Sequence, residues 1–250
     1  MKKLRRGFTL IEVSLFLAVS AALFVGITIG VQNSIRQQRF NDSVQGYAEF
    51  LRTMFAETLN VQHLGTGSTE TAVYGKMITF GEQKNLDGEN NSQKLIFAYD
   101  VIADADATSG NATAVSALKS MNAKVLAGGE ADSYLPRWSS EIQNDEYEPF
   151  VGTLLIVRHP TSGMVYTYFT DDVAEINDPE AFDRVGEEST TINIGTFLND
   201  EAEFKTGAMD FCVNPEPGQT NILRGDVRIV ENARNSSGVL VVGGEDTCNK

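Results

Sequence analysis

In residues 2–19, "KKLRRGFTLIEVSLFLAV", basic residues and a glycine precede a long apolar run. The run covers residues 8–31, and its 24 residues exceed the roughly 20 that a helix needs to cross the hydrocarbon core of a bilayer. The basic residues before it predict that the N-terminus stays in the cytoplasm and that the rest of the chain faces outward. The sequence therefore predicts one membrane-spanning helix.

Glu12 is the unusual residue of this run, because a carboxylate near the centre of a lone membrane helix costs about 2.5–3.5 kcal/mol. Three explanations are open: a removable export signal, an anchor with a tolerated charge, or a subunit that pairs Glu12 with a cation outside its own chain. An export signal has an apolar core of only about 7–15 residues. The run itself contains no Lys or Arg, so a partner cation has to come from elsewhere.

The helical pattern continues beyond Val31 as one apolar stripe with polar residues between its members. The stripe consists of Phe40, Val44, Tyr47, Leu51, Met54, Phe55 and Leu59. No proline occurs from residue 1 to residue 135. We therefore expect a single helix from about Phe8 to Gln62, roughly 80 Å long. Its first half, 8–31, is apolar all round, and its second half needs a partner along one side.

The string "RRGFTLIE", followed by a long apolar helix, closely resembles the prepilin signature of type IV pilins and of the pseudopilins of type II secretion and competence systems. The resemblance covers the first quarter of the chain. It implies that a membrane peptidase removes the leader 1–7 by cutting between Gly7 and Phe8, and that Phe8 is then N-methylated. It also makes Glu12 the assembly carboxylate, with the new amine of Phe8 in a neighbouring subunit as its partner cation.

The resemblance further implies the partners and the location of the protein. The partners are other pilin subunits, the prepilin peptidase, the inner-membrane assembly platform and, before assembly, the membrane. The chain would be a single-pass membrane protein with an extracytoplasmic domain, later packed into an extracellular or periplasmic filament. Many major pilins carry a proline near the position of Ile29, where this chain has Gly26 and Gly30 instead. This difference favours a minor pilin or pseudopilin over a major pilin.

Residues 63–250 are predicted to form a β-rich globular domain. Runs of β-branched and aromatic residues predict strands at 72–80, 94–101, 153–159, 164–170, 222–230 and 238–242. Turn residues at 160–163 and 235–238 predict two of the connections. We expect an α+β fold in which the long helix packs on an antiparallel sheet, as the pilin resemblance also implies.

Residues 103–150 are acidic and rich in small side chains, and we interpret them as an insertion between strands that carries individual function. The alternative is a solvated, weakly ordered excursion. One surface helix is expected here, ended by Gly128 and Gly129 and marked by Val115, Leu118, Met121 and Val125. A contrasting function is an adhesin or binding module that is displayed on the filament and holds its ligand through this insertion.

Cys212 and Cys248 are the only cysteines, and their separation of 36 residues fits no zinc or redox motif. In an exported protein we expect them to form a disulfide, which would stabilise the domain by about 3.5–4 kcal/mol on the chain-entropy model. In a cytosolic protein they would instead be two buried thiols.

The net charge of −14 would become −18 on loss of the leader, because the leader holds four basic residues and no acidic one. Such a surface repels nucleic acid and anionic lipid, so no nucleic-acid partner is expected. We also expect no enzyme activity, because His63 and His159 lie in no nucleophile or metal motif. A membrane-tethered enzyme would need a polar cleft that the sequence does not indicate.

No cofactor or metal is expected, and calcium is the alternative. Asn85, Asp87 and Glu89 alternate in "NLDGEN" in a way that weakly resembles a calcium loop, without the spacing of an EF-hand. Asp104 with Asp106 is a second candidate pair. An ordinary acidic turn explains either segment as well.

Overall fold

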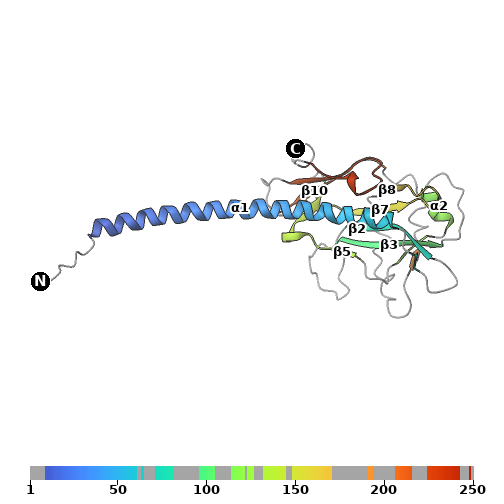
Figure 1. Ribbon diagram of the computed structural model, residues 1–250, viewed down its shortest axis with the longest axis horizontal. Coiled ribbons are helices and arrows are strands. Elements are labelled where there is room, and N and C mark those ends of the chain that lie inside the picture. The colour runs from blue at the N-terminus through green and yellow to red at the C-terminus, as the bar shows by residue number, and fades with distance from the viewer. Residues whose placement is uncertain are drawn as a thin grey trace.

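The structure is a computed structural model that describes residues 9–60, 63–64, 71–80, 96–104, 114–121, 123–126, 132–144, 148–170, 191–193, 206–215, 224–242 and 248. A long helix extends from one end of a domain built from antiparallel sheets (Figure 1). The predicted α+β class, with an apolar N-terminal helix and antiparallel strands, is confirmed at this level.

The helices are α1 (Leu10–Leu59) and α2 (Ala114–Ser120), with short 3-10 turns η1 (Arg137–Ser139) and η3 (Ser236–Gly238). The strands are β1 (His63–Leu64), β2 (Thr71–Phe80), β3 (Ile96–Asp104), β4 (Lys124–Leu126), β5 (Asp132–Tyr134), β6 (Glu141–Gln143), β7 (Gly152–Arg158), β8 (Val165–Thr170), β9 (Thr191–Asn193), β10 (Met209–Asn214), β11 (Gly225–Ile229) and β12 (Val239–Val242).

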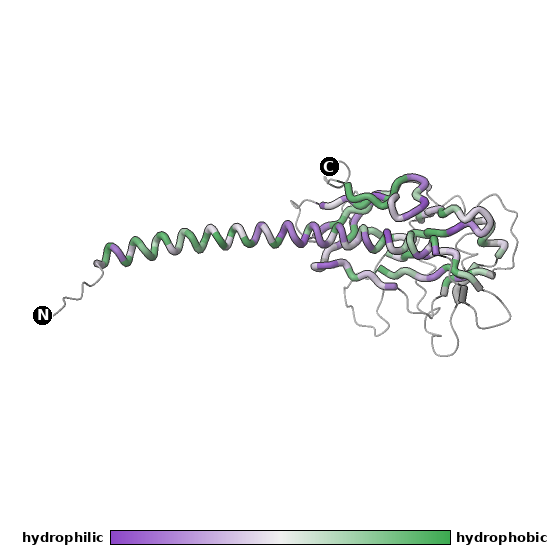
Figure 2. The backbone as a smooth tube through the Cα atoms, in the orientation of Figure 1, coloured by the Kyte–Doolittle hydropathy of each residue, from purple (hydrophilic) through white to green (hydrophobic). Residues whose placement is uncertain are grey.

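Helix α1 has two halves with different surroundings. None of its residues from 10 to 42 is buried, so this half, which we call the arm, projects from the domain. Figure 2 shows that the arm is mostly hydrophobic near its start and hydrophilic where it approaches the domain. The second half is buried along one stripe from Ser43 to Thr58. The folded unit therefore includes this half of α1 as well as the predicted domain 63–250.

The described strands form two antiparallel sheets. The larger sheet has the order β8-β7-β2-β3-β4-β9, with β1 paired to β2 and β5 paired to β3, and the smaller has the order β12-β11-β10-β6. Helix α1 contacts β2 and β7 of the larger sheet and β10, β11 and β12 of the smaller one. The main core thus lies where the second half of α1 packs against both sheets.

A second core covers the opposite face of the larger sheet. Leu118 and Met121, on and just after α2, are buried there against β2, β3 and β7. Strand β7 consequently has both faces covered, and its residues 152–157 are all buried. This explains the unbroken apolar segment "LLIV", because a strand buried on both faces does not need to alternate with polar residues.

Aromatic side chains join α1 to the two sheets. Tyr47 packs edge-on against Phe211 of β10 at 5.6 Å between ring centroids, and Phe50 stacks on Tyr134 of β5 at 5.0 Å. Each such pair contributes about 0.5–1.5 kcal/mol beyond the area it buries. Because Tyr47 is fully buried, these contacts fix both the depth and the rotation of α1 in the domain.

The predicted stripe of α1 is confirmed except at its last member. Leu59 is 38% exposed, whereas Thr58 is 2% exposed and takes the final position of the buried stripe. The Thr58 hydroxyl donates to the carbonyl oxygen of Met54 at 2.9 Å, which satisfies the hydroxyl inside the core. Residue 58 lies four positions after Met54 and three after Phe55, and therefore on the same face of the helix as both. Helix geometry rather than hydrophobicity thus decides which residue is buried.

The prediction for 103–150 needs correction for the residues that the structure describes. Helix α2 ends at Ser120, and Val125 lies in strand β4 rather than on the helix. Strands β4 and β5 pair with β3, and β6 pairs with β10 of the other sheet. The described residues of this stretch therefore contribute to both sheets and to the second core, and the predicted insertion between strands stays a prediction for the rest.

Candidate functional site

The arm is the candidate site, because it exposes apolar surface that the domain does not cover. Helix α1 is long and apolar enough to cross a membrane, and its most apolar window has no buried residue. Leu10 is 85% exposed and Phe24 is 71% exposed. Gly26 and Gly30 face open space, so each could receive another helix at close range.

The start of the arm holds Glu12 in a capping box with Thr9. The Thr9 backbone N–H donates to Glu12 Oε2 at 2.8 Å, and the Thr9 hydroxyl donates to the same oxygen at 2.9 Å. In return, the Glu12 backbone N–H donates to Thr9 Oγ1 at 3.3 Å. The spacing Thr-x-x-Glu is the sequence pattern of this motif, and it was overlooked in the sequence. Glu12 is thus hydrogen-bonded within its own chain, although hydrogen bonds to Thr9 supply no counter-charge.

The predicted processing site lies outside the described residues, since Gly7, Phe8 and the rest of the leader precede Thr9. The first residue that the structure describes is Thr9. Thr9 is the N-cap of α1, with φ −78° and ψ 151°, so the chain is extended just before the helix begins.

The structure pairs Cys212 with Cys248, as the sequence predicts. Both residues are buried, and Cys212 lies in the middle of β10 between β11 and β6. The bond therefore attaches the C-terminal end of the chain to the centre of the smaller sheet.

Lys76 is the most strongly engaged cation that the structure describes. Its Nζ lies 2.7 Å from Glu57 Oε2 on α1, 3.0 Å from Asp100 Oδ1 on β3 and 2.8 Å from Asp132 Oδ2 on β5. Burial alone would lower the pKa of the ammonium, but the hydrogen bonds to Asp132, Glu57 and Asp100 outweigh it and raise the pKa. This Lys76 cluster anchors the end of α1 to the larger sheet. Its members come from four elements (α1, β2, β3 and β5), so sequence spacing does not reveal it.

The other polar candidates give no catalytic or metal arrangement within the described residues. His159 Nδ1 accepts from the backbone N–H groups of Thr161 and Ser162 at 3.1 and 3.2 Å, so it organises the β7–β8 turn. His63 lies in β1. No group of three His, Cys, Asp or Glu side chains in the described part of the chain could hold a metal ion.

The calcium candidates fall mostly outside the described residues. Asn85, Asp87, Glu89 and Asp106 all lie there, and Asp104 is described only as the last residue of β3. The possibility of calcium binding therefore stays a sequence-based alternative.

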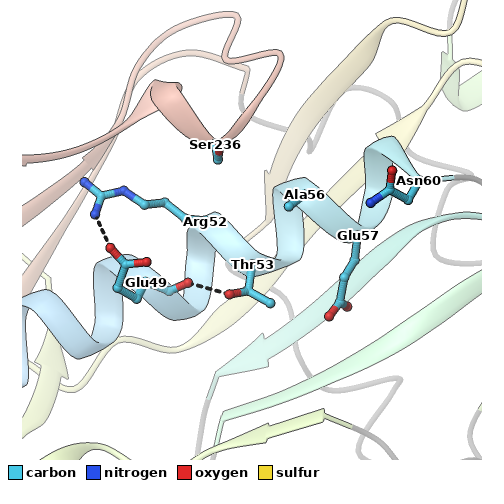
Figure 3. Close-up of a pocket in the computed structure, with 7 residues that line it drawn as sticks. All are labelled: Glu49, Arg52, Thr53, Ala56, Glu57, Asn60 and Ser236. Atoms are coloured by element: carbon cyan, nitrogen blue, oxygen red, sulfur yellow. Dashed lines mark hydrogen bonds and ion pairs between the residues drawn. The ribbon is translucent and has the colours of Figure 1, made fainter.

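A shallow groove of about 350 Å³ runs along the outer face of the second half of α1 (Figure 3). It is lined by Glu49, Arg52, Thr53, Ala56, Glu57, Asn60 and Ser236. Arg52 Nη1 donates to Glu49 at 2.6 Å and its Nη2 donates to the Val239 carbonyl oxygen at 3.1 Å, while Glu57 holds Lys76. All charged groups of the groove are thus engaged, and we assign no chemistry to it.

Comparisons with protein-family models, with curated proteins and with solved structures found no match to this chain. Its function must therefore be inferred from its own residues and geometry.

Proposed function

We propose that this chain is a structural subunit of a type IV pilus or type II secretion-like filament, assembled through its N-terminal helix. The observation that carries the proposal is the bare apolar arm, which follows a leader with the pattern of a prepilin and starts with a capped carboxylate. A minor pilin or pseudopilin fits better than a major pilin, because Gly26 and Gly30 stand where major pilins have a proline.

The arm needs an apolar environment on energetic grounds. It exposes fourteen large hydrophobic side chains between Leu10 and Ile35. Shielding each of them from water is worth roughly 1.5 kcal/mol or more, so the total is on the order of 20 kcal/mol. That exceeds the free energy of unfolding of a typical domain, about 5–15 kcal/mol. A bilayer before assembly and the packed arms of other subunits afterwards both provide the required shielding.

The arm also separates the domain from the membrane. Residues 32–42 continue the helix with mostly polar side chains beyond Val31. Eleven helical residues span about 16 Å. This spacing leaves the acidic domain clear of the lipid headgroups while the apolar segment is inserted, and it places the domain at the surface of a filament whose core is made of arms.

Glu12 has a role in each of the two environments. In the membrane, its hydrogen bonds to Thr9 reduce the cost of carrying a carboxylate in an apolar helix. In the filament, cleavage after Gly7 provides a charged amine on Phe8 of a neighbouring subunit, which can pair with Glu12. Because an unpaired charge inside an apolar core costs several kcal/mol, this pairing would set the register between subunits.

The test of the proposal is the mass of the chain recovered from the membrane of its host. Cleavage after Gly7 and addition of one methyl group to Phe8 are expected. Replacing Gly7 with Leu should leave the uncut precursor in the membrane, whereas Gly26→Leu is a control that leaves cleavage intact. An unprocessed wild-type chain, or a Gly7→Leu chain that is cut normally, would contradict the proposal.

A further inference from the structure

The surface where the arm leaves the domain carries an exposed tryptophan. Trp138, in the middle of η1, is 52% exposed, and Leu135, two residues before η1, is 53% exposed. The guanidinium carbon of Arg39 stands 5.2 Å from the centroid of the indole ring. Arg137 lies against α1, with its Nε 3.3 Å from the position that a Cβ on Gly46 would occupy. We call Arg39, Leu135, Arg137 and Trp138 the arm-exit shoulder.

The backbone at Trp138 is in a conformation that a bulky residue rarely adopts. Its φ is 59° and its ψ is 26°, in the left-handed region that favours glycine. The neighbouring contacts hold the turn in place, because the Ser43 hydroxyl donates to the Arg137 carbonyl oxygen at 3.3 Å. A strained backbone that presents a large aromatic side chain to solvent is a feature typical of binding sites.

The charges of the shoulder indicate what its partner offers. Within the described residues, neither Arg39 nor Arg137 has an ion-pair partner, and Arg39 Nε is buried without a hydrogen bond. Arg52 and Arg228, in contrast, are paired with carboxylates. A tryptophan ring under one guanidinium, with a second arginine next to it in the chain and no ion-pair partner for either among the described residues, suits a surface that combines apolar contact with carboxylates, since Trp and Arg are enriched at interface hot spots.

An anionic lipid surface is the competing partner, and the geometry argues against it. The apolar segment of α1 ends at Val31, and Arg39 follows eight residues later, about 12 Å along the helix axis. The headgroup layer is only about 5–7 Å thick on each side of a bilayer. Trp138 packs on Arg39 and therefore lies beyond the headgroups, even with the average helix tilt of about 20°.

We propose that the arm-exit shoulder is a docking surface for the acidic face of a second copy of this chain. The chain has 34 acidic and 20 basic residues, so a neighbouring copy presents the complementary charge. The shoulder adjoins the arm, and the inference rests on the proposed function, in which the arms of neighbouring subunits lie side by side; it adds that one such neighbour is a second copy of this chain. A shoulder that meets a different surface of its partner makes a heterologous contact, which is the type that extends into open helical filaments.

The test replaces Trp138 with a photo-crosslinking phenylalanine derivative in the full-length chain, expressed in the host membrane. Irradiation is expected to give a covalent product with twice the mass of the chain, joined at a peptide that contains acidic residues. Cross-linking only to lipid or to a different protein, or no cross-link at all, overturns the proposal. The filament fraction is measured separately. If the wild-type chain forms no filaments, the proposed function is contradicted. The cross-link tests the docking surface separately, because two copies can also be cross-linked while they are in the membrane.

Two variants separate docking from folding. Arg39→Glu should reduce the cross-linked product on the order of 30-fold, the effect of losing one interface hot spot. Arg234→Glu is the matched control, because Arg234 is exposed on a turn of the other sheet. Trp138→Gly removes the ring and relieves the positive φ, so the domain should unfold at the same or a higher temperature while joining filaments less. An unchanged product in Arg39→Glu, or wild-type filament levels in Trp138→Gly, would refute the docking surface.

Discussion

Replacement of Lys76 by Met tests how α1 is anchored to the domain. The substitution keeps a long side chain in place but leaves Glu57, Asp100 and Asp132 around a site that has lost its cation. Removal of one partner from a buried ion pair costs about 3–5 kcal/mol, whereas exposed pairs contribute about 0–1 kcal/mol. The Lys76 side chain is 9% exposed, but its three partners are 34–50% exposed. We therefore expect a loss between these limits, about 2–3 kcal/mol.

The assay is urea unfolding at pH 7, in which the midpoint should fall while the slope stays the same. Lys124→Met is the matched control, because it removes the same charge from the three-residue strand β4. Because the pKa of Lys76 is raised above 10.5, its contribution is complete below that pH and is lost as the pH rises through the raised pKa. Equal losses of stability in the Lys76→Met and Lys124→Met variants would show that Lys76 does not anchor α1.

Three further outcomes are expected for the domain. A fragment that starts at Arg36 keeps every buried residue of α1, so it should be soluble and unfold cooperatively; a gradual transition would count against the domain boundary. Mass spectrometry of unreduced, exported protein should find Cys212 bonded to Cys248, and loss of this bond should cost about 3.5–4 kcal/mol; two free thiols would contradict it. Gly225→Ala would place a Cβ 2.1 Å from a methyl carbon of Val44, so unfolding measurements should show a loss of about 1–3 kcal/mol, and wild-type stability would disprove this close approach.

Much of the architecture could be predicted from periodic patterns. The stripe at three- and four-residue intervals predicts which side of α1 is buried, and the turn at 160–163 correctly joins β7 and β8. The three-residue strands β4, β5, β6 and β9 could not be predicted, because three residues contain too little alternation. Strand β10 was also missed, since Asp210 and Asn214 interrupt its apolar pattern.

Some features of the candidate site could be predicted from the sequence, and others are visible only in the structure. Glu12 stands out in the sequence because it interrupts an apolar run, and its cap could have been found from the spacing between Thr9 and Glu12. The Lys76 cluster and the left-handed backbone of Trp138 could not have been predicted from the sequence, because each depends on contacts between elements that are distant in the chain. Local spacing therefore identifies the capped start of the arm, whereas tertiary packing determines the surface beside the arm.

Glu12 is proposed to act between subunits, and the share of the chain found in sheared filaments after Glu12→Val substitution tests this role directly. The variant should insert into the membrane and be cleaved like the wild type, because the costly carboxylate is gone and Gly7 is unchanged. It should be almost absent from filaments, since the amine of Phe8 would then enter the apolar core without a partner. A Glu12→Val chain that joins filaments at wild-type levels would contradict the account and make Glu12 a tolerated charge.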